Sequence, residues 1–260
     1  HAKEVWLPIN ELGDKEGLKF EDGNISMPQE FKDAYRKGIE EGWLSTSCKP
    51  EHGGMGVPTF FQAVTWAEFG TSACMALSVL PALSIGVYEV LAANGRQDLI
   101  DYFASNLASG EWAGTMCLTE PHAGTDLGII TTRAEPEDDG TYRISGTKIF
   151  ITYGEHDMAE NIVHLVLAKA PGGPEGTKGI SLFLVPKFLP AEWESGGLEG
   201  ISHDLVSEHN GVTCSGSEEK MGLHASPTCV MNFDDSVGWL VGPLHGGMPL
   251  MFQMMNRERV

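Results

Sequence analysis

The sequence changes character near Trp112, and this change constrains the fold more than any other feature. Before it, residues 29–43 and 59–94 carry apolar side chains at helical spacing or in long apolar stretches. After it, short β-branched runs alternate with turns rich in Gly, Pro and Asp. Because these strands follow one another without intervening helices, we expect an antiparallel sandwich or barrel. The sequence therefore predicts an α+β protein in which a helical part precedes a sheet.

Three domains follow from this change. We expect a helical N-terminal domain over residues 1–112, itself lacking its first part, and a β-barrel or sandwich middle domain over residues 113–240. Residues 241–260 resemble the start of a truncated C-terminal helical domain, and a helix that has only begun is expected to bury nothing. The order predicts that the 260 residues are a piece of a larger protein.

The apolar stretch at residues 59–94 is the longest in the chain. Gly70 and Pro81 interrupt it, so it predicts two or three closely packed helices. We find neither a charged segment followed by an apolar core nor an uninterrupted apolar run of about 18 residues. We therefore expect a cytoplasmic protein without membrane association.

The charge and the cysteines exclude several classes of protein. A formal net charge of −19 disfavours nucleic acid as a partner. The five cysteines contain no Cys-x-x-Cys pair and are expected to be reduced, and no histidine spacing indicates a metal site. An anionic ligand would need a local positive field. The lysines that could supply one are Lys148, Lys169, Lys178, Lys187 and Lys220.

The stretch "MCLTEPHAGTD", residues 116–126, begins as a strand and ends abruptly. Pro121 cannot donate to a sheet ladder, and Gly124 allows a turn or a close approach to a ligand. Thr125 and Asp126 are typical of a capped turn whose N–H groups could face a phosphate. Without a glycine-rich phosphate-binding pattern, the spacing leaves two interpretations open: a simple capped bend or a ligand-binding turn.

A second motif, "GTKIFITYG", lies at residues 146–154, about thirty residues further on. The order of "CLTEPHAGTD", "GTKIFITYG" and "EEKMGLHASPTCVMNFDD" after a helical part resembles the middle domain of the acyl-CoA dehydrogenase flavoprotein family. This similarity covers about residues 42–260. Residues 10–23 and 189–235 are similar to a large branch of that family that includes 3-methylmercaptopropionyl-CoA dehydrogenase.

The resemblance implies FAD as the cofactor. Residues 116–119 would lie along the isoalloxazine ring, and residues 150–152 would cover its other side. Thr125 would contact the pyrophosphate and border the acyl-CoA channel, and Leu118 and Thr125 are also the predicted substrate contacts. The predicted cofactor residues are Met116, Cys117, Leu118, Thr119, Gly124, Thr125, Phe150, Ile151 and Thr152.

Two positions differ from many members of the family. Phe150 stands where many have tryptophan, and its ring can still stack on a flavin. His122 stands where many have glycine, and it either shapes the pocket or lies on the loop surface.

The implied activity is FAD-dependent α,β-dehydrogenation of an acyl-CoA thioester, either 3-methylmercaptopropionyl-CoA or a related short or medium acyl-CoA. The implied partners are an electron-transfer flavoprotein or a similar acceptor, and other copies of the full-length protein in a homo-oligomer. Residues 1–260 alone are expected to be inactive and to bind FAD weakly or not at all, because the family holds FAD between this domain and further helices.

The reaction needs a carboxylate that takes the α-proton. The resemblance implies that this base lies outside the 260 residues. Glu258 is the one candidate within them, because some members place their base on the helix that begins here; the alternative is an ordinary surface glutamate. Glu120 is expected to fix the turn before Pro121 rather than to move protons.

Two other functions remain open. One is an acyl-CoA oxidase or flavin monooxygenase on the same scaffold, in which oxygen reaches the reduced flavin. The other is a non-catalytic β-domain that binds a partner or a lipid.

Overall fold

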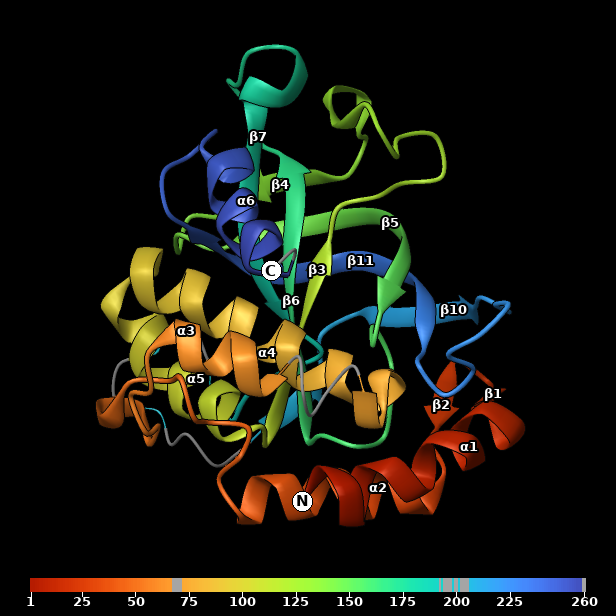
Figure 1. Cartoon of the computed structure of the whole chain (residues 1–260). Coiled ribbons are helices and arrows are strands. Elements are labelled where there is room, and N and C mark those ends of the chain that lie inside the picture. Colours follow the sequence, from red (N-terminus) through yellow and green to blue (C-terminus); the bar gives the residue numbers. More distant parts are fainter. Residues whose placement is uncertain (67–71, 192, 194–197, 199–200, 202–205, 259–260) are drawn as a thin grey trace.

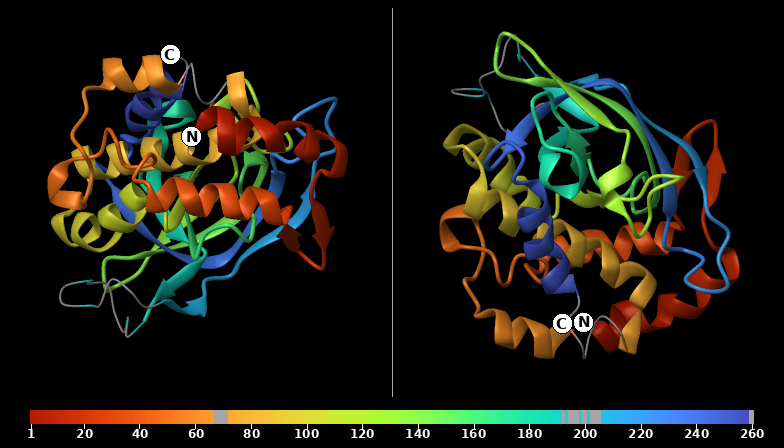
Figure 2. Two further views of the ribbon diagram at one scale, coloured as in Figure 1. Left: turned by 60° about the horizontal axis from the view of Figure 1, so that its bottom comes forward. Right: turned by 90° about the horizontal axis from the view of Figure 1, so that it is seen from above.

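A computed structural model describes residues 1–66, 72–191, 193, 198, 201 and 206–258. Helices gather on one side of a strongly curved sheet (Figures 1 and 2). The helices are α1 (Leu7–Glu16), α2 (Gln29–Glu40), α3 (Thr59–Trp66), α4 (Met75–Asn94), α5 (Gln97–Ser109) and α6 (Gly247–Glu258). Short helical turns occupy η1 (Ala2–Trp6), η2 (Pro50–His52), η4 (Leu127–Ile129) and η5 (Gly176–Gly179).

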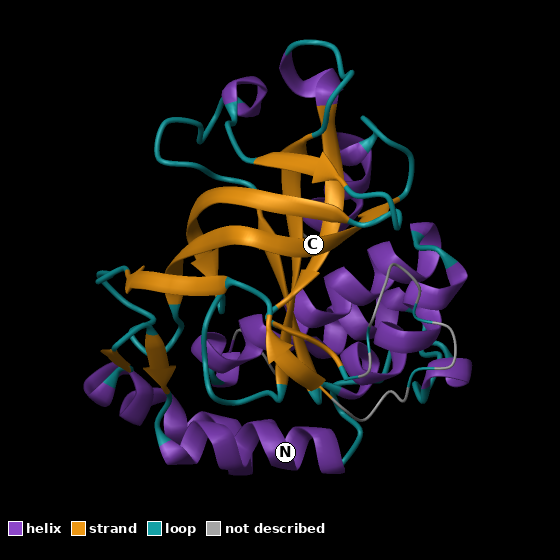
Figure 3. Ribbon diagram, turned by 180° about the vertical axis from the view of Figure 1, so that it is seen from behind, coloured by secondary structure: helices purple, strands orange, loops and turns teal. Residues whose placement is uncertain are grey.

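The main sheet has seven strands, which Figure 3 shows from behind. They are β3 (Trp112–Cys117), β4 (Arg133–Pro136), β5 (Tyr142–Thr152), β6 (Asn161–Lys169), β7 (Ile180–Pro186), β10 (Val212–Ser217) and β11 (Thr228–Val241). Two small hairpins lie outside it, formed by β1 (Lys19–Glu21) with β2 (Asn24–Ser26) and by β8 (Phe188–Pro190) with β9 (Val206–His209).

Five of the strands close into a ring in the order β11, β5, β4, β6, β7 and back to β11. β10 extends the sheet beside β11, and β3 extends it beside β6. A helical part followed by a barrel-like sheet confirms the predicted fold class. The predicted domain boundaries at residues 112 and 240 stay predictions, although the main sheet runs from Trp112 to Val241.

The expectation of a purely antiparallel sheet is wrong. β3 pairs with β6 in parallel from Trp112↔Asn161 to Cys117↔Val166, and β4 meets β6 in parallel at Arg133↔Lys169. β5 is antiparallel to β4, so the chain reverses before β5 and again after it. These two reversals return β6 to the direction of β3 and make the sheet mixed.

The C-terminal helix α6 also differs from expectation, because it buries one full face. Leu250, Met251 and Met254 are all buried in the core shared with α4 and the sheet. Arg257 pairs with Glu89 of α4 and donates a hydrogen bond to Gln62 of α3. The helix is therefore held at its apolar face and at its last turn.

Helix α4 is the long apolar element of the helical side. It continues through Pro81, where we expected a break, because buried side chains such as Leu77 and Leu83 hold both flanks in the core. The predicted interruption at Gly70 lies outside the described residues.

Among the residues that the structure covers, α4 is the one helix long and apolar enough to cross a membrane. Its most apolar window has a mean hydropathy of 1.7, and 72% of that window is buried inside the protein. An uninterrupted apolar run was not found in the sequence because Ser, Gly and Glu interrupt it, although the mean hydropathy stays at 1.7. A buried core helix passes the same test, so length and composition alone carry little weight here.

Helix α4 meets strand β3 at Gly114. Its backbone N–H donates to the Ser84 hydroxyl oxygen at 3.0 Å, and a Cβ added at Gly114 would lie 2.7 Å from the Val87 side chain. This close approach places the strand directly against the helix.

We predict that Gly114→Ala lowers the free energy of unfolding by about 1–3 kcal/mol, because the added methyl group must displace Val87 or the α4 backbone. Gly216→Ala is the matched control, since a Cβ there meets no atom within 4 Å, and it should change stability by less than about 0.5 kcal/mol. Urea denaturation of both variants measures this. Equal losses would contradict the close approach of α4 and β3.

Candidate functional site

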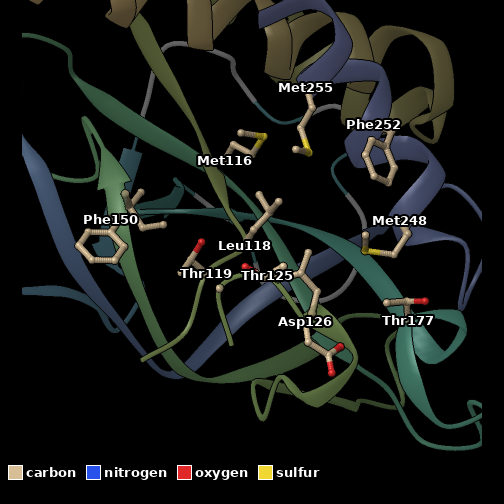
Figure 4. A pocket seen from close by; sticks show the side chains of 13 residues that line it. Met116, Leu118, Thr119, Thr125, Asp126, Phe150, Thr177, Met248, Phe252 and Met255 are labelled. Atoms are coloured by element: carbon tan, nitrogen blue, oxygen red, sulfur yellow. The ribbon is translucent and has the colours of Figure 1, made fainter. Parts of the chain in front are cut away.

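A hollow of about 460 Å³ opens between the end of β3, the loop that follows it, β5 and α6 (Figure 4). Its walls include Met116, Leu118, Thr119, Gly124, Thr125, Phe150 and Ile151, all of which the sequence analysis predicted as cofactor residues. The lining residues that it did not predict are Asp126, Leu127, Thr177, Met248, Phe252 and Met255.

Strand alternation explains why Cys117 is not in the lining. Met116 and Leu118 face the hollow, so Cys117 between them points to the opposite side of the strand. There it is fully buried, and its sulfur lies 3.9 Å from Nδ1 of His164. The family role expected of this stretch involves its main chain, which the side-chain direction does not affect. That role stays a prediction.

Thr152 is half-buried at the end of β5, opposite Thr228 of β11, and it is also absent from the lining. Its predicted contact with the cofactor is untested. Ile151 and Phe150, immediately before it, both reach the hollow.

Phe150 lies in a β-bulge. The register of β5 and β11 passes from Cys229↔Ile151 to Met231↔Lys148, so Ile149 and Phe150 face the single residue Val230. Phe150 has a φ of 60°, which is uncommon for a residue with a side chain, and 57% of it is exposed. The bulge turns this ring out of the regular alternation toward the hollow. Nothing in the run "KIFIT" signals it.

A buried ion pair underlies the hollow. The carboxylate of Glu120 accepts hydrogen bonds from the backbone N–H and the hydroxyl of both Thr131 and Thr132, at 2.6–3.0 Å. The ammonium of Lys148 donates to the same carboxylate at 2.9 Å and to the carbonyl of Leu118 at 3.1 Å. Both side chains are almost fully buried.

This pair connects the three segments that form one side of the hollow. Glu120 begins the loop after β3, Thr131 and Thr132 end it, and Lys148 belongs to β5. One backbone bond, from the N–H of Ile149 to the carbonyl of Thr119 at 2.8 Å, runs beside the pair. The geometry agrees with the structural role predicted for Glu120.

The ionisation of the pair follows from its surroundings. Burial would raise the pKa of Glu120, but the Lys148 ammonium and the bonds from Thr131 and Thr132 lower that pKa to about 2. Burial lowers the pKa of Lys148, and Glu120 opposes that shift. A carboxylate with so low a pKa is a poor proton acceptor.

Lys148 is therefore not a free cation for an anionic ligand, contrary to what the sequence allowed. Three other candidates bind groups of the protein: Lys169 the carbonyl of Gly128, Lys187 the carboxylate of Glu155, and Lys220 the carbonyl of Ser226. Lys178 is exposed next to Thr177, at the rim of the hollow.

Helix α6 supplies the opposite wall. Met248, Phe252 and Met255 lie three or four residues apart and share the face turned to the hollow (Figure 4). The sequence analysis missed them because it expected this helix to bury nothing. Glu258 is the last residue of α6, and the structure does not describe its side chain, so its proposed role as a base is untested.

The described part of the chain contains no group of three or more His, Cys, Asp or Glu side chains that could hold a metal ion. All five cysteines are free and buried. The hollow therefore offers hydrophobic side chains, hydroxyls, the carboxylate of Asp126 and main-chain groups.

We predict that Glu120→Gln and Lys148→Met each lower the free energy of unfolding by about 3–5 kcal/mol, because each leaves its partner buried without a counter-charge. The double variant should lose less than the sum of the two. Urea denaturation of the four proteins at pH 7 gives the coupling energy. Additive losses would contradict a direct interaction.

The same pair predicts an acid dependence. Since the pKa of Glu120 is about 2 in the folded protein, below its ordinary value of 4.5, the carboxylate stabilises the fold above pH 4.5. This contribution is lost as the pH falls from 4.5 toward 2. Between these limits wild-type protein should lose more stability than Glu120→Gln, and identical pH curves would contradict the assignment.

The bulge predicts that glycine and alanine variants differ in stability in opposite directions at two positions of β5. Phe150→Gly should be more stable than Phe150→Ala by about 1 kcal/mol, because glycine adopts a positive φ without steric cost. At Arg143, which is not among the positive-φ residues, alanine should be the more stable of the two. Chemical denaturation of the four variants measures both differences. If the alanine variant were the more stable one at both positions, the bulge at Phe150 would be contradicted.

Two family models match the chain, one over its helical part and one over its sheet. A model of the acyl-CoA dehydrogenase N-terminal domain matches residues 17–111, and a model of the acyl-CoA dehydrogenase middle domain matches residues 115–236.

Two curated relatives match nearly the whole chain. 3-Methylmercaptopropionyl-CoA dehydrogenase of Ruegeria pomeroyi is 44% identical over 256 residues, which cover 98% of this chain and 42% of that protein. A butyryl-CoA dehydrogenase of Syntrophomonas wolfei is 38% identical over 271 residues, covering 100% of this chain and 42% of that protein. The chain thus spans less than half the length of these relatives.

Solved structures share the fold. Butyryl-CoA dehydrogenase from Megasphaera elsdenii matches with a TM-score of 0.74 at 21% identity, over 99% of this chain and 60% of that one. An acyl-CoA dehydrogenase from Bacillus anthracis, complexed with FAD, matches with a TM-score of 0.72 at 23% identity, over 99% of this chain and 38% of that one.

Proposed function

The chain belongs to the acyl-CoA dehydrogenase family, and from this premise we propose that the whole protein catalyses the FAD-dependent α,β-dehydrogenation of an acyl-CoA thioester. The observation that carries the proposal is the hollow, because it brings together most of the residues that the resemblance assigns to the flavin. These residues come from β3, its loop and β5, which are well separated in sequence.

The residues present fit a flat aromatic cofactor. Phe150 presents a half-exposed ring at the hollow, and Met116 and Leu118 turn apolar side chains toward it. In this proposal residues 116–119 hold the isoalloxazine ring with their main chain, and Phe150 stacks beside it. Gly124 and Thr125 hold the pyrophosphate.

The bound FAD supplies an acceptor for the hydride that leaves the β-carbon of the substrate. The chain's own residues orient the reactants and exclude water. Met248, Phe252 and Met255 on α6 form an apolar wall opposite β3, which suits both tasks.

The base that takes the α-proton is proposed to lie beyond these residues, with Glu258 as the candidate within them. Glu120 is unsuited to this step. Its carboxylate is buried, ionised and occupied by five hydrogen-bond donors, and its pKa is about 2.

We propose a neutral short or medium acyl chain as the substrate, with 3-methylmercaptopropionyl-CoA among those to test. The name of the Ruegeria relative supports this substrate. The lining supports the neutral class: its one charged side chain is the acid Asp126, so it offers no cation that would bind a second carboxylate on the acyl chain. Methionine side chains are flexible and would tolerate chains of different length.

The remaining expectations about the whole protein are also proposals. They are an electron-transfer flavoprotein or a similar acceptor as the redox partner, a homo-oligomer and a cytoplasmic location. Family resemblance supports the first two, and the composition is compatible with the third.

We predict that the whole protein purifies with FAD and that its flavin absorbance is bleached anaerobically by 3-methylmercaptopropionyl-CoA and butyryl-CoA. Glutaryl-CoA should act at least about tenfold less well, because the lining offers no cation for its second carboxylate.

Two results would contradict the proposal in different ways. Rapid oxygen consumption during turnover would indicate the oxidase or monooxygenase alternative. A colourless protein that takes up no FAD would favour a non-catalytic binding domain.

A further inference from the structure

We propose that His122 is a positioning residue that holds the ligand-facing limb of the loop after β3 in its binding conformation. The inference concerns residues 123–127, called here the ligand limb. It rests on the proposed function only for the identity of the ligand, FAD.

The ligand limb is an exposed part of the hollow. Gly124, Thr125 and Asp126 are exposed, and together with Leu127 they line one wall. The limb begins at a pair of backbone bonds between Glu120 and Ala123, both 3.0 Å long. It ends where the carboxylate of Asp126 accepts a hydrogen bond from the backbone N–H of Gly128 at 2.9 Å.

Three side chains hold the return limb, residues 128–132. Lys169 donates to the carbonyl of Gly128 at 2.8 Å, and the Glu120 carboxylate binds Thr131 and Thr132. Nε2 of His122 lies 3.1 Å from the next carbonyl, that of Ile129. The return limb therefore has side-chain partners along its length.

His122 differs from the other two side chains in what it connects. Lys169 belongs to β6, and the Glu120 carboxylate binds Lys148 of β5, so both fasten the return limb to the sheet. His122 directly precedes the ligand limb and bonds across the loop, from residue 122 to residue 129. It is therefore a brace between the two limbs.

The same ring nitrogen has a second polar neighbour. Nε2 of His122 also lies 3.6 Å from the Glu120 carboxylate, whose charge favours the tautomer that carries a proton on Nε2. In that tautomer His122 donates to the carbonyl of Ile129. Of the two roles left open by the sequence, the geometry therefore favours shaping the pocket over a free surface position.

A loop that is already ordered loses less conformational entropy when its ligand binds. Loss of the brace should therefore weaken FAD binding, while kcat measured at saturating FAD changes little because no reacting atom is touched. One hydrogen bond at a half-exposed position corresponds to about a three- to tenfold change in affinity.

The test compares His122→Leu with His122→Gln in the whole protein. Leucine removes the donor but keeps a side chain of similar bulk, and glutamine restores an N–H that can reach the carbonyl of Ile129. His224→Leu is the matched control, because His224 also contacts backbone carbonyls, those of Asp14 and Lys220, but lies outside the loop after β3.

Amide hydrogen exchange of residues 123–128 in FAD-free protein is the first measurement, and the Kd for FAD is the second. The segment in His122→Leu should exchange about three- to tenfold faster, and the variant should bind FAD more weakly by a similar factor, with kcat at saturating FAD kept. His122→Gln and His224→Leu should both match wild-type protein.

Unchanged exchange in His122→Leu would overturn the proposal, as would faster exchange without any change in FAD affinity. Failure of His122→Gln to restore either property would also overturn it, since the brace is then not a hydrogen bond. If wild-type protein takes up no FAD, the proposed function fails, and the exchange rates alone decide whether His122 braces the loop.

Discussion

The buried ion pair of Glu120 and Lys148 is the interaction on which the candidate site depends. Taking two charges out of water is costly, and the cost is recovered only when the geometry and the additional hydrogen bonds are good. Here five donors surround one carboxylate, and the lysine also binds the carbonyl of Leu118. The pair lies where the two ends of the loop after β3 meet β5, so it fixes the three segments on one side of the hollow relative to one another.

The rest of the fold supplies the surfaces around this point. Helix α4 packs closely on β3 at Gly114 and supports the strand from behind. Helix α6 is held in the same core by Met251 and Met254 and faces β3 across the hollow. The site is thus a gap between a sheet edge and a helix, with a bulge in β5 directing Phe150 into it.

The sequence predicted the helices and strands well, but it did not predict how they pair and pack. Helical spacing and β-branched runs distinguish helix from strand locally, so the order of a helical part followed by a sheet could be predicted. The parallel pairing of β3 with β6 could not, because partners are chosen by the path of the chain through β4 and β5. In the sequence Lys148 could not be distinguished from the other lysines, because its partner Glu120 is 28 residues away and only the fold brings the two together. The bulge at Phe150 had no local signal, and the apolar wall of α6 was missed because this helix was expected to bury nothing. The residues of β3 and its loop were found through the family resemblance.

The central claim is that the hollow held by Glu120 and Lys148 receives the flavin. A crystal structure of the whole protein with FAD tests it most directly. The account predicts density for the isoalloxazine ring against the main chain of residues 116–119, with Phe150 beside it and the pyrophosphate at Gly124 and Thr125. Density for FAD elsewhere, with the hollow filled by side chains of the protein itself, would contradict it.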